Sequence, residues 1–163
     1  VGDYVGMLAT IQNALILSEV LLSKKCPSQV FTCLQMNKVA GLYTQKKADY
    51  ALSQKQICFF AGGVGNPLFT TDTAAVIRAV ELKADIVMKG TKVDGIFTSD
   101  PAKNKSAKFI KNISFDEVLA RKLNVMDMTA FTLARDHNIN IVTFNLTKKG
   151  NIKKALIAGS IGS

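Results

Sequence analysis

The sequence predicts an α/β protein, built as a three-layer αβα sandwich around a mostly parallel central sheet. Short apolar segments alternate along the chain with longer segments whose apolar residues recur at helical spacing, a pattern typical of βαβ units. Residues 57–61, ICFFA, form an unbroken apolar run of the kind found in buried parallel strands. With 163 residues, of which 48% are hydrophobic, residues 1–163 are expected to form a single domain with a sizeable core.

The elements follow from local patterns. Short runs of β-branched, aromatic or aliphatic residues predict strands at residues 29–34, 57–61, 86–88 and 140–144. Helical periodicity predicts helices at residues 7–23, 46–53, 71–83, 114–121, 129–137 and 151–158. Ser114 and Glu117 match a capping box, and Asp127 is a good N-cap for the helix that follows it.

Composition excludes several classes of protein. The three cysteines are an odd count without C-x-x-C spacing, and there is one histidine, so a disulfide framework, a zinc site and a Ser/His/Asp hydrolase are all disfavoured. No apolar run reaches the roughly 18 residues of a spanning helix, the most apolar stretch being interrupted by Ser18 and Glu19, and no signal-peptide pattern is present. We therefore expect a cytoplasmic protein without a membrane partner.

The net charge of +9 fits either a nucleic-acid binder or an enzyme that holds polyanionic nucleotides. The lysines are scattered along the chain and aromatic residues make up only 7% of it, which speaks against nucleic acid. Ligands of parallel sheets bind beyond the C-terminal ends of the strands, so the loops of interest are residues 62–70, 89–101 and 145–150.

The first of these loops belongs to the segment GGVGNPLFTTD, residues 62–72. Its glycines permit positive φ, and Thr70, Thr71 or Asp72 can cap the helix that follows, whose N-terminus favours an anion. The segment lacks the lysine and spacing of a Walker A loop and is not a Rossmann fingerprint. A glycine-rich turn with a threonine cap and no ligand remains the alternative.

The second loop belongs to the segment KGTKVDGIFTSDP, residues 89–101. Thr91 and Lys92 can meet phosphate oxygens, and Phe97 offers a surface on which a base can stack. A solvated loop of β-turns remains the alternative. Two further segments are VMDMTAFTLARD, residues 125–136, and GDYVGMLAT, residues 2–10, in which Asp3 can cap the first helix.

Taken together, these four segments resemble the bacterial UMP kinases, a family of the amino-acid kinase superfamily. GGVGNPLFTTDTAA is similar to that family's G-T-G-N-P-F-F-T-T-D-x-A-A, and KGTKVDGIFTSDP to its K-A-T-K-V-D-G-V-Y-x-x-D-P. VMDMTAFTLARD and GDYVGMLAT resemble V-M-D-x-T-A-F-x-L-A-R-D and G-D-x-M-G-M-L-A-T. The resemblance covers the whole chain and keeps the spacing between the motifs.

The resemblance implies an activity, transfer of the γ-phosphoryl group of ATP to UMP, and a role for each matching residue. Asp3 would hydrogen-bond the UMP ribose. UMP would also be bound by Val64, Gly65, Asn66, Pro67, Leu68, Phe69, Thr70 and Thr71. ATP would be held by Thr91, Phe97 and Asp100. Asp72 would organise active-site lysines or Mg²⁺, and Lys92 would add positive charge; no residue is assigned as a direct protein ligand of a metal.

The resemblance also implies Mg²⁺ as cofactor, a homohexamer, and GTP and UTP as effectors of an allosteric enzyme of pyrimidine biosynthesis. The chain departs from the family at Val64, which stands where threonine is usual, and at Leu68, which replaces a phenylalanine and should change packing more than chemistry. A K-x-S-G motif, a G-G-G-N loop and an arginine, which precede the G-D motif in the family, are not in this sequence. We therefore expect these 163 residues to be part of a longer protein and not a competent kinase alone.

Three alternatives remain open. One is another superfamily kinase, acting on a small carboxylate or phosphate. The second is a non-catalytic module that binds UMP or UTP without turnover. The third is a nucleic-acid binder, which only the net charge suggests.

Overall fold

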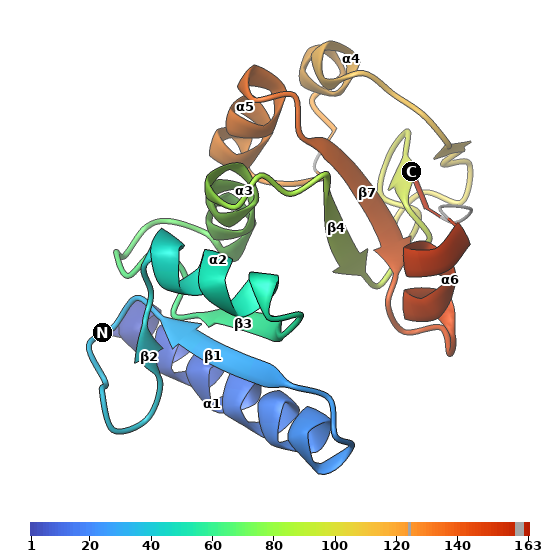
Figure 1. The fold of residues 1–163 in the computed structure, drawn as a ribbon. Helices are drawn as coiled ribbons and strands as arrows, with labels where there is room; N and C mark the ends of the chain where they lie inside the picture. Colours follow the sequence, from blue (N-terminus) through green and yellow to red (C-terminus); the bar gives the residue numbers. More distant parts are fainter. Residues whose placement is uncertain (124, 159–161) are drawn as a thin grey trace. The chain divides into compact units, whose positions relative to one another are not determined.

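The structure is a computed structural model and describes residues 1–123, 125–158 and 162–163. Its residues group into two compact units, Val1–Leu82 and Lys83–Ser163, and each is described by itself (Figure 1). Both units combine parallel strands with helices, as the sequence predicts. That residues 1–163 form a single domain stays a prediction.

The first unit contains a parallel sheet with strand order β2-β1-β3. Its elements are α1 (Gly2–Ser23), β1 (Ser28–Thr32), β2 (Gly41–Leu42), α2 (Gln45–Ser53), β3 (Ile57–Ala61) and α3 (Thr71–Glu81). The two-residue strand β2 was not predicted because it is too short to give a pattern. Strand β1 ends at Thr32, earlier than the predicted residue 34. The Thr32 side-chain oxygen accepts a hydrogen bond from the Leu34 backbone N–H, and this contact stabilises a turn directly after the strand.

Helices cover both faces of this sheet (Figure 1). The cluster on one face comprises Ile11, Ala14, Val30 and Ala61. The cluster on the other face comprises Phe31, Ala48 and Ala51. Val30 and Phe31 are neighbours on β1 and point to opposite faces, so α1 packs on one side of the sheet and α2 on the other. The predicted layering of helix, sheet and helix is present in this unit.

Helix α1 differs most from expectation. It begins at Gly2, earlier than the predicted residue 7. By length and composition alone, its 22 residues, which include an 18-residue stretch with a mean hydropathy of 1.6, would suffice to cross a membrane. The expectation that no segment reaches this length was wrong, because the helix continues through Ser18 and Glu19. Ser18 is buried and hydrogen-bonds the Ser28 hydroxyl at 2.9 Å, on the face that packs against the sheet.

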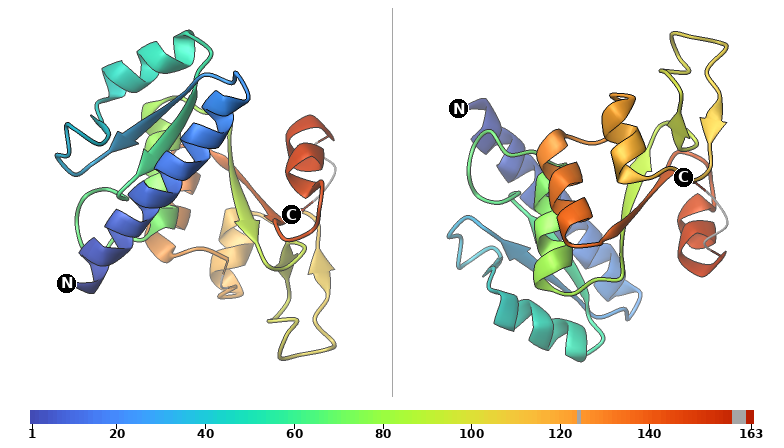
Figure 2. Two further views of the ribbon diagram at one scale, coloured as in Figure 1. Left: turned by 90° about the horizontal axis from the view of Figure 1, so that it is seen from below. Right: turned by 90° about the horizontal axis from the view of Figure 1, so that it is seen from above.

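The second unit contains the parallel pair β4–β7 and the antiparallel pair β5–β6 (Figure 2). Its elements are β4 (Ile86–Thr91), β5 (Ile96–Phe97), β6 (Phe109–Ile110), α4 (Phe115–Ala120), α5 (Met128–Asp136), β7 (Asn140–Asn145) and α6 (Asn151–Ala158). Strand β4 runs on to Thr91, beyond the predicted end at residue 88, because it pairs with β7 along its whole length. The β5–β6 pair was not predicted.

The two predicted helix caps of this unit are confirmed. Ser114 and Glu117 form a complete capping box at the start of α4. The Asp127 carboxylate accepts a hydrogen bond of 2.9 Å from the Ala130 backbone N–H at the start of α5. These caps satisfy N–H groups that helices leave without intrahelical partners.

Candidate functional site

The glycine-rich loop of the first unit joins β3 to α3. Gly62, Gly63 and Gly65 all have positive φ, between 60° and 82°, and the Gly65 N–H donates to the Gly62 carbonyl at 3.0 Å. A Cβ atom at Gly65 would lie 3.0 Å from the Cβ of Cys33. Glycine is therefore required at position 65 by both conformation and space.

Helix α3 begins directly after this loop. Of the three residues considered for its N-cap, Thr70 takes the role, and its hydroxyl accepts from the Thr73 N–H at 3.2 Å. Asp72 lies in the first turn of α3. The positive end of the helix dipole and a backbone bent by glycine make this a suitable anion site.

The sequence had suggested that Asp3 caps α1, but in the structure it does not. The N-cap is Val1, without a side-chain hydrogen bond, and Asp3 lies inside the first turn. Its Oδ2 atom instead accepts a hydrogen bond of 3.0 Å from the Leu68 backbone N–H, so Asp3 holds the predicted UMP-binding loop. Leu68 has φ of 72° and a side chain that is 95% exposed, so the expectation that this residue chiefly affects packing was wrong.

A polar cluster of Cys33, Tyr43, Arg78 and Glu81 contacts the glycine-rich loop, and the sequence analysis did not predict it. The Arg78 guanidinium lies 3.7 Å above the Tyr43 ring, pairs with Glu81 and donates to the Cys33 sulfur at 3.0 Å. The Cys33 thiol in turn donates to the Gly63 carbonyl at 3.1 Å. These contacts connect the interior of α3 to the glycine-rich loop.

Burial and hydrogen bonding shift the pKa values of Tyr43 and Glu81 in this cluster. Burial, together with the 2.6 Å hydrogen bond that the phenol donates to Glu81, raises the pKa of Tyr43 to about 12. Burial alone would raise the pKa of Glu81, but the hydrogen bonds from Tyr43 and Arg78 outweigh it and hold that pKa below its ordinary value.

We expect the protein to lose stability at alkaline pH through Tyr43. The folded state keeps the phenol proton up to a pKa of about 12, whereas the unfolded chain releases it near 10.0. The stabilisation is therefore fully present below pH 10.0 and is lost as the pH rises towards 12. Urea unfolding across this range should show the decline, and Tyr43→Phe should reduce its slope; an identical slope in the variant would contradict the assignment.

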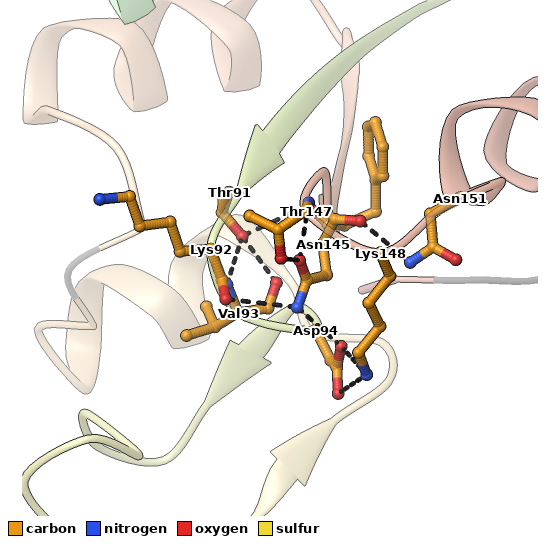
Figure 3. Close-up of polar contacts among 9 residues, drawn as sticks. Thr91, Lys92, Val93, Asp94, Asn145, Thr147, Lys148 and Asn151 are labelled. Carbon is orange, nitrogen blue, oxygen red and sulfur yellow. Dashed lines mark hydrogen bonds and ion pairs between the residues drawn. The ribbon is translucent and has the colours of Figure 1, made fainter.

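In the second unit, the predicted ATP-binding loop leaves the end of β4. The Thr91 hydroxyl donates to the Val93 carbonyl at 2.7 Å and accepts from the Val93 N–H at 3.2 Å. Thr91 therefore closes a tight turn through its own side chain. Figure 3 shows the Lys92 side chain directed away from Asp94 and Lys148, and it is exposed.

Asn145, at the end of β7, fixes this loop (Figure 3). Its Nδ2 atom donates to the Lys92 carbonyl at 3.2 Å and to the Asp94 carboxylate at 3.1 Å. Its Oδ1 atom accepts from the Thr147 N–H and hydroxyl, at 3.0 and 2.7 Å. The Lys148 ammonium lies 2.6 Å from Asp94, and hydrogen bonds from Lys148 and Asn145 lower the pKa of the Asp94 carboxyl.

A cavity of about 460 Å³ lies beside this loop. The three predicted ATP residues, Thr91, Phe97 and Asp100, all line it. Arg121 and Lys122 also line it and were missed, because nothing in the sequence separates them from other exposed basic residues. A cavity of this size with an aromatic ring and nearby cations suits a nucleotide.

The structure thus divides the predicted site residues between its two units. Asp3, the loop of residues 64–71 and Asp72 belong to the first unit, and Thr91, Lys92, Phe97 and Asp100 belong to the second. Among the described residues, no group of three or more histidine, cysteine, aspartate or glutamate side chains is arranged to hold a metal ion. Magnesium that arrives on nucleotide phosphates needs only one or two carboxylates, so the residues present are compatible with it.

Comparison with known proteins identifies the family to which the chain belongs. The model of the amino acid kinase family matches residues 2–145, and the chain belongs to this family. Within it, the chain is 45% identical over its whole length to uridylate kinase from Blochmanniella pennsylvanica, covering 68% of that protein. It is 44% identical over 99% of its length to the chloroplastic uridylate kinase PUMPKIN of Arabidopsis thaliana, covering 48% of it.

A solved structure, UMP kinase from Bacillus anthracis, superimposes with a TM-score of 0.93 at 38% identity, covering 98% of this chain and 66% of that one. The predicted α/β fold class and the family resemblance are confirmed. The chain spans from about half to about two thirds of the length of these relatives.

Proposed function

We propose that the protein transfers the γ-phosphoryl group of ATP to UMP and forms UDP. The observation that carries this proposal is the cavity of about 460 Å³ whose walls include all three residues expected to hold ATP. The similarity to uridylate kinases over the whole chain supports UMP as the acceptor.

The first unit is proposed to bind UMP. The phosphate of UMP would lie at the N-terminus of α3, where backbone N–H groups and the helix dipole favour an anion. Asp3 would bind the ribose through its Oδ1 atom, since Oδ2 already accepts from Leu68. The remaining contacts would come from Val64 to Thr71, with Val64 contributing only its backbone because valine has no hydroxyl.

The second unit is proposed to bind ATP. Phe97, whose ring meets that of Phe109 edge-on at 5.6 Å, would stack against the adenine. Thr91 and Asp100 would contact the rest of the nucleotide, and Lys92 would add charge near the phosphates. Mg²⁺ would supply neutralisation of the charge on the transferring group.

In the chemical step, the UMP phosphate is already ionised and needs no strong general base. Phosphoryl transfer depends mainly on positioning and electrostatic stabilisation. The chain's contribution would be to align the two nucleotides and to provide Asp72 as the carboxylate that organises lysines or Mg²⁺. No covalent enzyme intermediate is required.

We further propose a homohexamer in the cytoplasm, with GTP and UTP as effectors. The support for assembly is the outer face of α1, where Leu8, Ile16, Leu17 and Val20 are each about half exposed. Light scattering on the full-length protein would measure its mass. Flotation with liposomes would test the competing idea that this face contacts lipid, and binding to them would contradict the cytoplasmic assignment.

The direct test is a steady-state assay of the full-length protein with MgATP and UMP, beside CMP, dTMP and small carboxylate acceptors. Selective turnover of UMP supports the proposal. Preference for a carboxylate would indicate another kinase of the family, and binding of UMP without turnover would indicate a regulatory module. Adding GTP or UTP to the same assay tests their effect.

Asp72→Asn is expected to lower kcat about 10²- to 10³-fold, as loss of one electrostatic stabiliser typically does. The substitution keeps the size of the side chain and removes only its charge. Unfolding of the variant by urea serves as the control for folding. Full activity in a folded variant would remove Asp72 from the mechanism.

A further inference from the structure

Two consecutive hydrogen bonds connect α3 to the glycine-rich loop after β3. The Arg78 guanidinium, on α3, donates to the Cys33 sulfur at 3.0 Å. The thiol of Cys33, the residue that follows β1, donates in turn to the Gly63 carbonyl at 3.1 Å. A thiol alone is a weak donor and a weak acceptor. A charged group that donates to the sulfur polarises the S–H bond, so the second hydrogen bond becomes stronger than it would be without Arg78.

Arg78 is itself held in one position. Its guanidinium pairs with Glu81 and lies 3.7 Å above the Tyr43 ring, and its side chain is 12% exposed. The Tyr43 phenol also donates to Glu81, at 2.6 Å. A planar guanidinium that an ion pair and an aromatic ring already hold loses little further freedom when it donates to a sulfur. Arg78 can therefore serve as a fixed point for the Cys33 thiol.

The hydrogen bond to Gly63 decides which way the next backbone N–H points. Because a peptide bond is planar and trans, the Gly63 carbonyl and the Val64 N–H point in opposite directions. The Gly63 carbonyl points to the Cys33 sulfur, so the Val64 N–H points away from it. In the part of the chain that the structure describes, this N–H makes no hydrogen bond. It is therefore available to a ligand.

Val64 is the first residue of the loop proposed to bind UMP. Its side chain has no hydroxyl, so the backbone N–H is the only hydrogen-bond donor that it can offer. A Cβ atom at Gly65 would lie 3.0 Å from the Cβ of Cys33, so Cys33 contacts the loop on both sides of Val64. A donor that is oriented before its ligand arrives binds it without a further cost of ordering the loop.

We propose that Arg78 is a positioning residue for the acceptor nucleotide, which acts through the Cys33 thiol to fix the Gly63–Val64 peptide so that the Val64 N–H can donate to an oxygen of UMP. This inference rests on the proposed function in taking this loop as the binding site of UMP. The residues that the sequence assigned to that site include neither Arg78 nor Cys33.

The first test measures the affinity of the full-length protein for UMP by calorimetry, so no turnover is needed. Cys33→Ala keeps the Cβ atom beside Gly65 and removes only the sulfur. We expect it to bind UMP about 3- to 10-fold more weakly, the effect of one neutral hydrogen bond. Cys33→Ser restores a donor and an acceptor and should bind UMP within about 2-fold of wild type. The affinity for MgATP should stay unchanged in both variants.

A double-mutant cycle shows whether Arg78 acts through Cys33. Arg78→Gln removes the charged donor and should weaken UMP binding at least as much as Cys33→Ala does. Adding Cys33→Ala to Arg78→Gln should then weaken it by no more than about 2-fold further, because the connection to the loop is already broken. Tyr43→Phe is the matched control, since it removes a hydrogen bond to Glu81 and keeps both bonds of Cys33. It should lower the melting temperature without changing the affinity for UMP.

Equal UMP affinity in Cys33→Ala and wild type would overturn the inference. Fully additive losses in the double variant would also overturn it, and so would a loss in Tyr43→Phe as large as that in Cys33→Ala, which would indicate a general role in stability. Should Arg78→Gln not fold, the cysteine variants and Tyr43→Phe still decide. Absence of UMP binding in wild type would overturn the acceptor site together with the inference, whereas UMP binding without transfer from MgATP would overturn the proposed function alone.

Discussion

An Asn145→Ala variant is expected to bind MgATP about 30- to 150-fold more weakly than wild type, a loss of about 2–3 kcal/mol. Asn145 is 7% exposed, and its amide donates to both the Lys92 carbonyl and the Asp94 carboxylate. Without it, the Lys92 carbonyl and the Asp94 carboxylate of the loop after β4 lose the hydrogen bonds of this amide. The loop that carries Thr91 towards the nucleotide cavity would then no longer be held in one conformation.

Calorimetric titration of the full-length protein with MgATP would measure this loss. Asn151→Ala is the matched control, because Asn151 donates to the Asn145 backbone carbonyl at 2.9 Å and, in the part of the chain that the structure describes, makes no hydrogen bond to the loop itself. An Asn145→Ala protein that binds MgATP as wild type does would show that the loop is held without this amide. A loss of equal size in both variants would indicate general damage to the end of β7.

Phe31→Ala is expected to lower the free energy of unfolding by about 3–5 kcal/mol, the usual cost of deleting a buried aromatic ring. Phe31 is 1% exposed and stacks on Phe60 with ring centroids 5.9 Å apart. It also meets the Tyr43 ring edge-on at 6.4 Å. Its loss would leave a cavity between the sheet of the first unit and α2.

Urea unfolding followed by circular dichroism would measure this change. Tyr50→Ala is the control, because Tyr50 lies on α2 with its side chain 69% exposed, and it should change stability by no more than about 0.5 kcal/mol. A small effect of Phe31→Ala would contradict the packing of this ring in the core.

Features that depend on neighbours in sequence could be predicted. The caps at Ser114 and Asp127 were expected because a short polar side chain bonds an N–H only three residues away. The strands β3 and β7 were likewise evident from their own residues. Asp3 was misjudged because its carboxylate accepts a hydrogen bond from the Leu68 backbone N–H, far along the chain.

The supporting polar residues could not be predicted. Asn145 lies in a strand whose alternation gives no sign that its amide holds a distant loop. The contact of Arg78 with Cys33 joins residues 45 positions apart. Pairings of this kind become visible only when the fold brings the residues together.

The local pairing of β1, β2 and β3 has a consequence for the order in which the chain folds. The residues paired between β1, β2 and β3 lie within residues 28–61, whereas Ile86 of β4 pairs with Asn140 of β7, which is synthesised much later. Closing a short loop costs less chain entropy than closing a long one, and contacts between near neighbours form sooner. During translation, the strands of the first unit can therefore pair while β7 has not yet been synthesised, which shortens the time for which the apolar strand β3 is exposed to other nascent chains.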